Sequence, residues 1–176
     1  MRWLLTVLLA ACSASVDVKG TDAAPPADGP RDTPPIDARP CEGGTGRGTA
    51  PDGACVVRFD TPATYADAAA ACVAFGSQLA IVNTSERDAL ARTLAGATDL
   101  FIGLTDQATE GAFVWSDGTA VGYTNFYLNE PNDGSGVYPE DCIVINGVRG
   151  GQWDDRRCAP DPATGAGGVF PYLCMF

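Results

Sequence analysis

The chain has 176 residues, 45% of them hydrophobic and 19% charged, which is enough for one globular domain with a core of its own. Its formal net charge of −11 and pI of about 4.2 argue against nucleic acid or anionic lipid as a partner. The absence of histidine excludes Ser-His-Asp and Cys-His catalysis, and it removes the usual imidazole ligand of zinc, copper and iron. Any metal site must therefore be built from oxygen or sulfur.

The first residues have the pattern of an export signal. A basic start at residues 1–2 precedes an apolar run over residues 3–11 that is too short to span a bilayer. The run ends Leu9-Ala10-Ala11-Cys12, which resembles the bacterial lipobox, where the chain is cut before the cysteine and lipid is attached to it. We expect a signal peptide over residues 1–11, lipidation of Cys12, and an exported protein anchored in the bacterial outer membrane or at the cell surface. An ordinary secretory signal followed by an incidental cysteine is the alternative.

Residues 12–40 are predicted to be a lipidated cysteine followed by a disordered tether. The segment 13–40 holds six of the thirteen prolines and five aspartates, and it has almost no large apolar side chains to bury. The domain is expected over residues 41–176. With Cys12 set aside, six of the seven cysteines remain, an even set that predicts three disulfides in an oxidising compartment.

The patterning after Cys41 predicts an α+β domain, with two helices followed by a run of strands. The first helix is expected over residues 64–75, and the cap residues 83–86 begin a second that runs to about Ala95. Residues 122–137 form a long irregular segment rich in Asn, Gly and Tyr, and such loops in compact domains usually carry function. The expected strands cover residues 55–59, 79–82, 101–104, 113–115, 142–145, 151–153 and 169–175.

The order of several short motifs resembles that of the C-type lectin domain over nearly all of residues 41–176. Any one of these tripeptides is weak evidence, whereas eight in the family's order, with cysteines in place, are strong. The matching pieces are Thr64-Tyr65-Ala66-Asp67-Ala68 leading to Cys72, Gly76-Ser77-Gln78-Leu79-Ala80, Phe101-Ile102-Gly103-Leu104-Thr105-Asp106, Trp115-Ser116-Asp117-Gly118, Glu130-Pro131-Asn132-Asp133, Glu140-Asp141-Cys142, Trp153-Asp154-Asp155 with Cys158, and Tyr172-Leu173-Cys174.

The resemblance implies the C-type lectin fold, with two helices, small antiparallel sheets, a long irregular calcium-binding loop region and three disulfides. Six cysteines allow fifteen pairings, so the sequence itself leaves the connectivity open. The pairing that the family implies is Cys41–Cys55, Cys72–Cys174 and Cys142–Cys158.

Seven carboxylate or amide side chains that belong to these motifs lie in the stretch 130–155, and Ca²⁺ prefers such oxygen ligands; they are Glu130, Asn132, Asp133, Glu140, Asp141, Asp154 and Asp155. The resemblance assigns a primary Ca²⁺ site to Glu130, Asn132, Glu140, Asp154 and Asp155. It also implies a cis peptide bond before Pro131. The first four of these ligands would also hydrogen-bond the sugar, and the Glu-Pro-Asn order goes with mannose-type sugars. An auxiliary Ca²⁺ site maps to Asp106, Glu110, Asp133 and Asp141.

Two departures from the family pattern bear on this site. The stretch 134–139 is longer than in mannose-binding protein and is long enough to shift Glu140. Asp154 stands where the family usually has asparagine, and a carboxylate cannot donate a hydrogen bond. We therefore expect calcium binding to be kept while the sugar preference weakens or changes.

Three other interpretations compete with a lectin. Glu130-Pro131-Asn132 alone reads as a turn. A C-type-lectin-like module that binds a protein partner, with Ca²⁺ only bracing its loops, is the chief alternative, because fold does not fix function. A glycoside hydrolase needs one carboxylic acid in an apolar pocket, whereas these carboxylates are crowded together like ligands. We predict Ca²⁺-dependent carbohydrate binding and no enzyme activity, with Trp115, Trp153 and Phe101 in the core and the membrane contacted only through the lipid.

Overall fold

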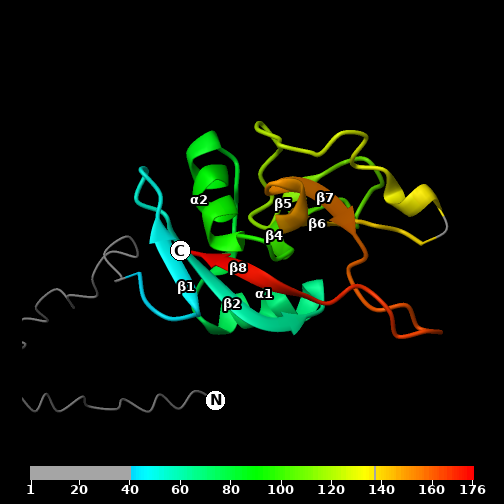
Figure 1. Cartoon of the computed structure of the whole chain (residues 1–176), viewed down its shortest axis with the longest axis horizontal. Helices are drawn as coiled ribbons and strands as arrows, with labels where there is room; N and C mark the ends of the chain where they lie inside the picture. Colours follow the sequence, from blue (N-terminus) through cyan, green and yellow to red (C-terminus); the bar gives the residue numbers. More distant parts are fainter. Residues whose placement is uncertain (1–40, 137) are drawn as a thin grey trace, which may run out of the picture. The chain divides into compact units, whose positions relative to one another are not determined.

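The computed structural model of the protein describes residues 41–136 and 138–176 (Figure 1). The signal peptide expected over residues 1–11, the lipidation of Cys12 and the tether expected up to residue 40 lie outside the described residues. In the part of the chain that is described, neither helix has the length and apolar character needed to cross a membrane. The described residues form an α+β domain, which confirms the fold class predicted from the sequence.

The two helices begin where the sequence offers a threonine cap. In α1 (Tyr65–Ala74) the Thr64 hydroxyl accepts a hydrogen bond from the Asp67 amide at 3.2 Å. In α2 (Ser85–Ala95) the Thr84 hydroxyl accepts one from the Arg87 amide, also at 3.2 Å. Each cap satisfies a backbone N–H that the first helical turn leaves without a partner, so the local sequence fixes both starts.

The strands form one connected sheet in the order β1-β2-β8-β4-β6-β7, with β3 beside β8 and β5 beside β4. The pairing of β4 with β8 is parallel, so the sheet is mixed, whereas several small antiparallel sheets were expected. The strand bounds are β1 Gly46–Thr49, β2 Cys55–Ala63, β3 Gln78–Leu79, β4 Leu100–Thr105, β5 Val114–Trp115, β6 Cys142–Asn146, β7 Gln152–Arg156 and β8 Phe170–Met175.

Two of these strands differ from the expected ranges in a way that matters for the site. The strand expected over residues 79–82 is limited to β3, which ends at Leu79. The next residue, Ala80, donates its amide to the Leu173 carbonyl and accepts from the Gly103 amide. The last strand before Cys158 was expected to end at Trp153 but runs to Arg156. Asp154 and Asp155 therefore lie within β7, where backbone pairing with β6 holds them in place.

The alternating side chains of β8 divide the core into two layers. Leu173 and Met175 pack into the cluster that contains α2, and Tyr172 and Cys174 pack into the cluster that contains α1. The two helices accordingly lie on opposite sides of the β2–β8 ladder, and the long loops that follow β5 lie toward β7 (Figure 1). Trp115, Trp153 and Phe101 are almost fully buried, as expected.

Three disulfides brace the domain, and their pairing is the one the family resemblance implied. Cys41–Cys55 closes the segment that contains β1, and Cys142–Cys158 joins the start of β6 to the residues after β7. Cys72–Cys174 ties α1 to β8 over a sequence separation of 102 residues. Closing a loop of that length restricts the unfolded chain by about 4–5 kcal/mol in the chain-entropy model, an upper figure.

Candidate calcium and ligand site

Strand β7 and the loop after β5 bring three carboxylates together. One carboxylate oxygen from each of Glu130, Asp154 and Asp155 lies within 4.8 Å of the others, although Glu130 is 24 or more residues away in sequence. Asp154 and Asp155 are 0% and 1% exposed. Three buried or half-buried carboxylates at this spacing repel one another unless a cation lies between them. The structure therefore places three of the five expected primary residues in one cluster.

The segment 130–133 is held onto Asp155. The Asp155 Oδ2 atom accepts hydrogen bonds from the backbone amides of Asn132 and Asp133, at 2.9 and 2.6 Å. The Glu130–Pro131 peptide bond is cis, as the resemblance implied. The Asn132 side-chain amide contacts the Glu130 carboxylate, so Asn132 lies at the edge of the same cluster. The Asp155 carboxylate thus holds the loop in the position that brings Glu130 and Asn132 to the cluster.

The remaining oxygen of Asp155 has no protein partner. Its Oδ1 atom is buried and makes no hydrogen bond with the described residues. A buried carboxylate oxygen without a partner is costly, and coordination to a cation removes that cost. A set of ligands made only of oxygen atoms suits Ca²⁺ better than it suits softer metal ions. The residues present therefore fit a bound Ca²⁺ ion.

Glu140 lies beside this cluster and does not belong to it among the described residues. Its backbone amide donates to Asp133 Oδ1 at 2.9 Å, and its side chain runs alongside Gly134, where an added Cβ would lie 3.0 Å from Glu140 Cδ. The carboxylate lines a pocket of about 290 Å³ that also contains Arg156, Arg157 and the stretch 166–168. Burial raises the pKa of the Glu140 carboxyl, and Arg156 partly offsets the rise.

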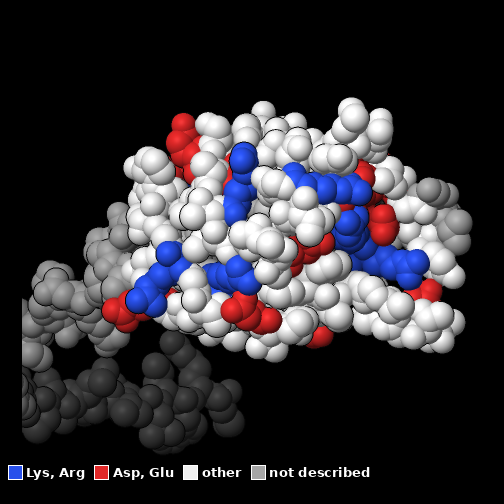
Figure 2. Space-filling view, in the orientation of Figure 1, with Lys and Arg blue, Asp and Glu red and all other residues white. Residues whose placement is uncertain are grey.

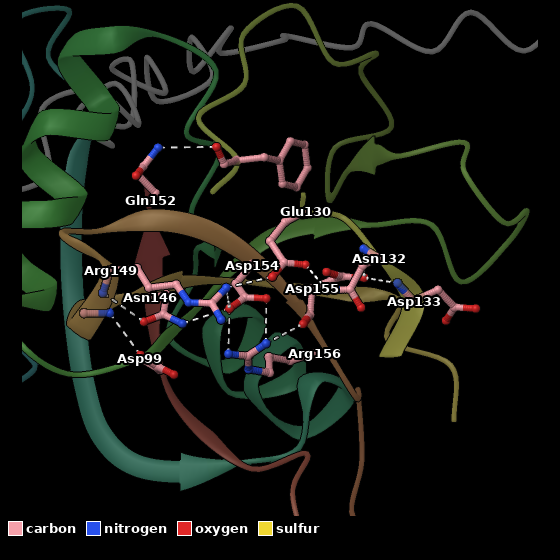
Figure 3. A network of polar contacts seen from close by, with 12 residues as sticks. Asp99, Glu130, Asn132, Asp133, Asn146, Arg149, Gln152, Asp154, Asp155 and Arg156 are labelled. Carbon is pink, nitrogen blue, oxygen red and sulfur yellow. Dashed lines mark hydrogen bonds and ion pairs between the residues drawn. The ribbon is translucent and has the colours of Figure 1, made fainter. Parts of the chain in front are cut away.

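Two arginines and an asparagine that the sequence analysis did not single out surround Asp154. Arg156 forms two short contacts to the Asp154 carboxylate, both at 2.6 Å. Arg149 Nη1 lies 2.9 Å from Asp154 Oδ2 and 2.7 Å from Glu130 Oε1. Asn146 Nδ2 donates to the same Asp154 oxygen at 2.8 Å. Both oxygens of the Asp154 carboxylate therefore already accept from protein donors (Figure 3).

The short 3-10 helix η3 (Gly147–Arg149) presents Arg149 to the cluster. The Asn146 side chain accepts a hydrogen bond from the Arg149 backbone amide at 3.2 Å, which caps η3. The Arg149 guanidinium lies over the Tyr127 ring, 4.4 Å from its centroid. Burial raises the pKa of Glu130, and its hydrogen bond to Arg149 opposes the rise. The same hydrogen bond raises the pKa of Arg149.

A signal for these basic residues was present in the sequence. Arg149, Arg156 and Arg157 lie on either side of Trp153-Asp154-Asp155, in a chain that has only 11 lysines and arginines. Figure 2 shows acidic and basic side chains touching one another at the end of the domain where β7 lies, in place of a continuous acidic surface. Arginines close in sequence to Asp154 and Asp155 thus supply positive charge beside these two carboxylates.

A second cluster lies next to the first. One oxygen from each of Glu110, Asp133 and Asp141 lies within 4.8 Å of the others, which brings together three of the four expected auxiliary residues. Asp106, the fourth, accepts from the Gly111 amide at 2.8 Å through Oδ2, and its Oδ1 atom is buried without a partner. Burial raises the Asp106 pKa, and the charges of Asp141 and Asp133 add to it. This arrangement also fits a cation.

Comparisons with known proteins identify relatives of the domain. Residues 61–163 match the family described as "Lectin C-type domain". Human tetranectin is 29% identical over 127 residues, which cover 69% of this chain and 59% of tetranectin. The mouse low affinity immunoglobulin epsilon Fc receptor is 42% identical over 83 residues, or 47% of this chain and 24% of the receptor. The chain thus spans less than two thirds of the length of these curated relatives.

A solved structure gives the same result for the fold. The mouse scavenger receptor C-type lectin carbohydrate-recognition domain superposes with a TM-score of 0.64 at 26% identity. The match covers 77% of this chain and 98% of the scavenger receptor domain. The mixed sheet, the two helices and the loop region are therefore those of a known domain type.

Proposed function

Since the chain belongs to the C-type lectin domain family, whose members are binding domains and not enzymes, we propose that it binds carbohydrate in a Ca²⁺-dependent manner. The proposed primary Ca²⁺ ligands are Glu130, Asn132, Glu140, Asp154 and Asp155. The proposed auxiliary ligands are Asp106, Glu110, Asp133 and Asp141.

One observation carries this proposal more than any other. The carboxylates of Glu130, Asp154 and Asp155 converge within 4.8 Å, and the Asp155 Oδ1 atom is buried with no hydrogen-bond partner. Ca²⁺ takes six to eight oxygen ligands from carboxylates, amides and water, so such a cluster leaves positions for ligand hydroxyls. Glu130, Asn132, Glu140 and Asp154 are proposed to hydrogen-bond those hydroxyls.

The sugar class is proposed from Glu130-Pro131-Asn132, the order that goes with mannose-type sugars in the family. Affinity for a single monosaccharide is expected to be weak, because a shallow site that holds two hydroxyls gains little net free energy. Several anchored copies on one membrane would raise the effective affinity without any new contact.

Retention of the mature protein on mannose resin tests this function. The proposal predicts retention in Ca²⁺, release by EDTA, and weaker retention on galactose resin. A Glu130→Gln variant keeps the size of the side chain and removes one ligand charge, so it should pass through the mannose column. Equal passage of wild type and variant in saturating Ca²⁺ would contradict carbohydrate binding of the mannose type.

A protein-binding or adhesion module with structural Ca²⁺ is the second candidate, and the surroundings of Asp154 favour it. Arg149, Arg156 and Asn146 already donate to both Asp154 oxygens, which leaves that carboxylate little capacity for a sugar hydroxyl. This second function predicts that Ca²⁺ raises the unfolding temperature of the protein while no sugar resin retains it.

The three disulfides fit an extracellular domain, because such bonds persist in oxidising compartments. Membrane anchoring through lipid on Cys12 is proposed from the sequence Leu9-Ala10-Ala11-Cys12. In a bacterial host, labelled fatty acid should be incorporated into the wild-type protein and not into a Cys12→Ala variant. Labelling of both proteins would contradict the anchor.

A further inference from the structure

Arg149 lies where a bound cation would lie. Its Nη1 atom is 2.7 Å from Glu130 Oε1 and 2.9 Å from Asp154 Oδ2, and these two residues belong to the cluster of three carboxylates. Figure 3 shows the guanidinium reaching between the two side chains from η3. The positive charge therefore bridges two of the groups that are proposed to hold Ca²⁺.

We propose that Arg149 is an internal cation of the primary site, and that Ca²⁺ binds there by displacing the guanidinium from Glu130 and Asp154. This inference rests on the proposed Ca²⁺ site and adds how that site is regulated. Arg149 holds the cluster together in the absence of Ca²⁺ and lowers the affinity for the ion.

The distances make the two cations competitors. Ca²⁺ lies about 2.3–2.6 Å from its oxygen ligands, so an ion bound by Glu130 and Asp154 occupies the space in which Arg149 Nη1 now lies. A guanidinium and a Ca²⁺ ion at such close range also repel each other strongly in a half-buried site. Binding of the ion therefore requires the arginine to move away.

The contacts of Arg149 allow its side chain to move out of the cluster and back. Its side chain is about one third exposed (34%), and both of its carboxylate contacts run through Nη1 alone. Its guanidinium carbon lies over the Tyr127 ring, which is itself 37% exposed, so the side chain has an aromatic surface to pack against at the edge of the site. Gly150 and Gly151 follow directly, both at positive φ, and turn the chain back into β7.

Arg156, the second arginine, stays in contact with Asp154 when the ion binds. Arg156 contacts both oxygens of Asp154 at 2.6 Å and donates to the Asp155 carbonyl at 2.9 Å. With Asn146 it keeps the Asp154 carboxylate oriented after Arg149 has moved. Asp154 thus has one permanent counter-charge and one that exchanges with the ion.

Calcium titration by calorimetry tests the exchange. All proteins carry Glu110→Gln and Asp141→Asn, so that only the primary cluster is measured. Arg149→Met, which keeps much of the apolar stem and removes the charge, should bind Ca²⁺ about tenfold more tightly, the factor that corresponds to about 1.4 kcal/mol. Arg149→Lys keeps the charge and should stay closer to the starting protein. Arg47→Met removes the same charge from an exposed position on β1 and should leave the affinity within about twofold.

A second readout uses no Ca²⁺. In EDTA, Arg149→Met should unfold at a lower temperature than Arg47→Met, because Glu130 and Asp154 lose the cation between them. In saturating Ca²⁺ this difference should disappear. An unchanged or weaker Ca²⁺ affinity of Arg149→Met would overturn the exchange and leave the proposed calcium site standing. Binding by Arg149→Met with none by the starting protein would support the exchange and contradict Ca²⁺-dependent function. Absence of binding in every variant would overturn both.

Discussion

The indole Nε1 of Trp153 donates a hydrogen bond to Asp88 Oδ1 at 2.8 Å, and both residues are almost fully buried. Asp88 lies in α2, whereas Trp153 lies in β7 directly before Asp154. The other oxygen of Asp88 accepts from Tyr123 and Asn125 in the long loop. One buried carboxylate therefore joins the helix, the strand and the loop from which the candidate site is built.

Removing this carboxylate should destabilise the whole domain. Asp88→Ala leaves the indole N–H and the Asn125 amide without their buried acceptor, which costs about 2–4 kcal/mol in unfolding free energy. Urea denaturation in EDTA measures the loss. Glu42→Ala removes an exposed carboxylate and should change the stability by no more than about 0.5 kcal/mol. Equal stabilities of the two variants would contradict the structural role of Asp88.

The unpartnered oxygen of Asp155 predicts the effect of an amide at that position. Asp155→Asn still has an oxygen to accept from the Asn132 and Asp133 amides, but it removes one ligand charge from the primary cluster. We expect the Ca²⁺ affinity of that cluster to fall by at least about tenfold, while the unfolding temperature in EDTA stays the same or rises because the carboxylates repel less. A calcium titration with wild-type affinity would rule out Asp155 as a ligand.

The second cluster predicts a separate binding event. Glu110 is exposed and belongs only to the group with Asp133 and Asp141. Glu110→Gln should therefore remove one of two calcium-binding steps and leave the other within about threefold. A substitution of Asp133 would not separate the two sites as well, because Asp133 also contacts residues of the primary site. Its amide donates to Asp155, and its carboxylate accepts from the Glu140 amide. A single unchanged binding step in Glu110→Gln would argue against the auxiliary site.

The carboxyl groups of the two clusters predict an unusual dependence of stability on pH. Burial raises their pKa values, and neighbouring carboxylates add to the shift. The groups with raised values are Asp106, Glu110, Glu130, Glu140 and Asp141. A raised pKa in the folded state means that the folded domain binds more protons than the unfolded chain. Its stability therefore falls as the pH rises from the ordinary carboxyl range, about 4, through these raised values.

Thermal unfolding in EDTA should accordingly give a higher midpoint at pH 5 than at pH 7. Residues with lowered pKa values, such as Asp52 and Asp161, act in the opposite sense, but only below about pH 4. Saturating Ca²⁺ should reverse the order of the two midpoints, because protons compete with the ion for the same oxygens. A midpoint in EDTA that rises steadily from pH 5 to pH 7 would contradict the crowding of these carboxylates.

The sequence predicted the parts of the fold that depend on local chemistry. Thr64 and Thr84 mark the helix starts because a hydroxyl at that position caps the first turn. The closing strand and the burial of Trp115 and Trp153 were also expected, and the structure contains both. The connection of the strands into one mixed sheet was not predictable in this way, because it depends on pairings such as Phe101 with Tyr172, 71 residues apart.

In the candidate site, too, some residues could be identified from local motifs and others depend on the fold. Glu130, Asp154 and Asp155 were identified by motif, and the structure brings them together. The position of Glu140 depends on the conformation of the longer 134–139 stretch, which no motif specifies. Asp88 was missed because its role comes from a contact to Trp153, 65 residues away, that leaves no local pattern. Arg149 lies near the Trp153-Asp154-Asp155 motif, but its contact with Glu130 comes from the fold and is not part of any motif.

A crystal structure of the protein soaked with Ca²⁺ and mannose would show directly whether the carboxylate cluster holds the ion and the sugar. We expect an ion about 2.3–2.6 Å from carboxylate oxygens of Glu130 and Asp155, with two sugar hydroxyls in its coordination shell and the Arg149 guanidinium moved away from Glu130. An empty primary cluster at saturating Ca²⁺, with Arg149 still bridging Glu130 and Asp154, would contradict this expectation.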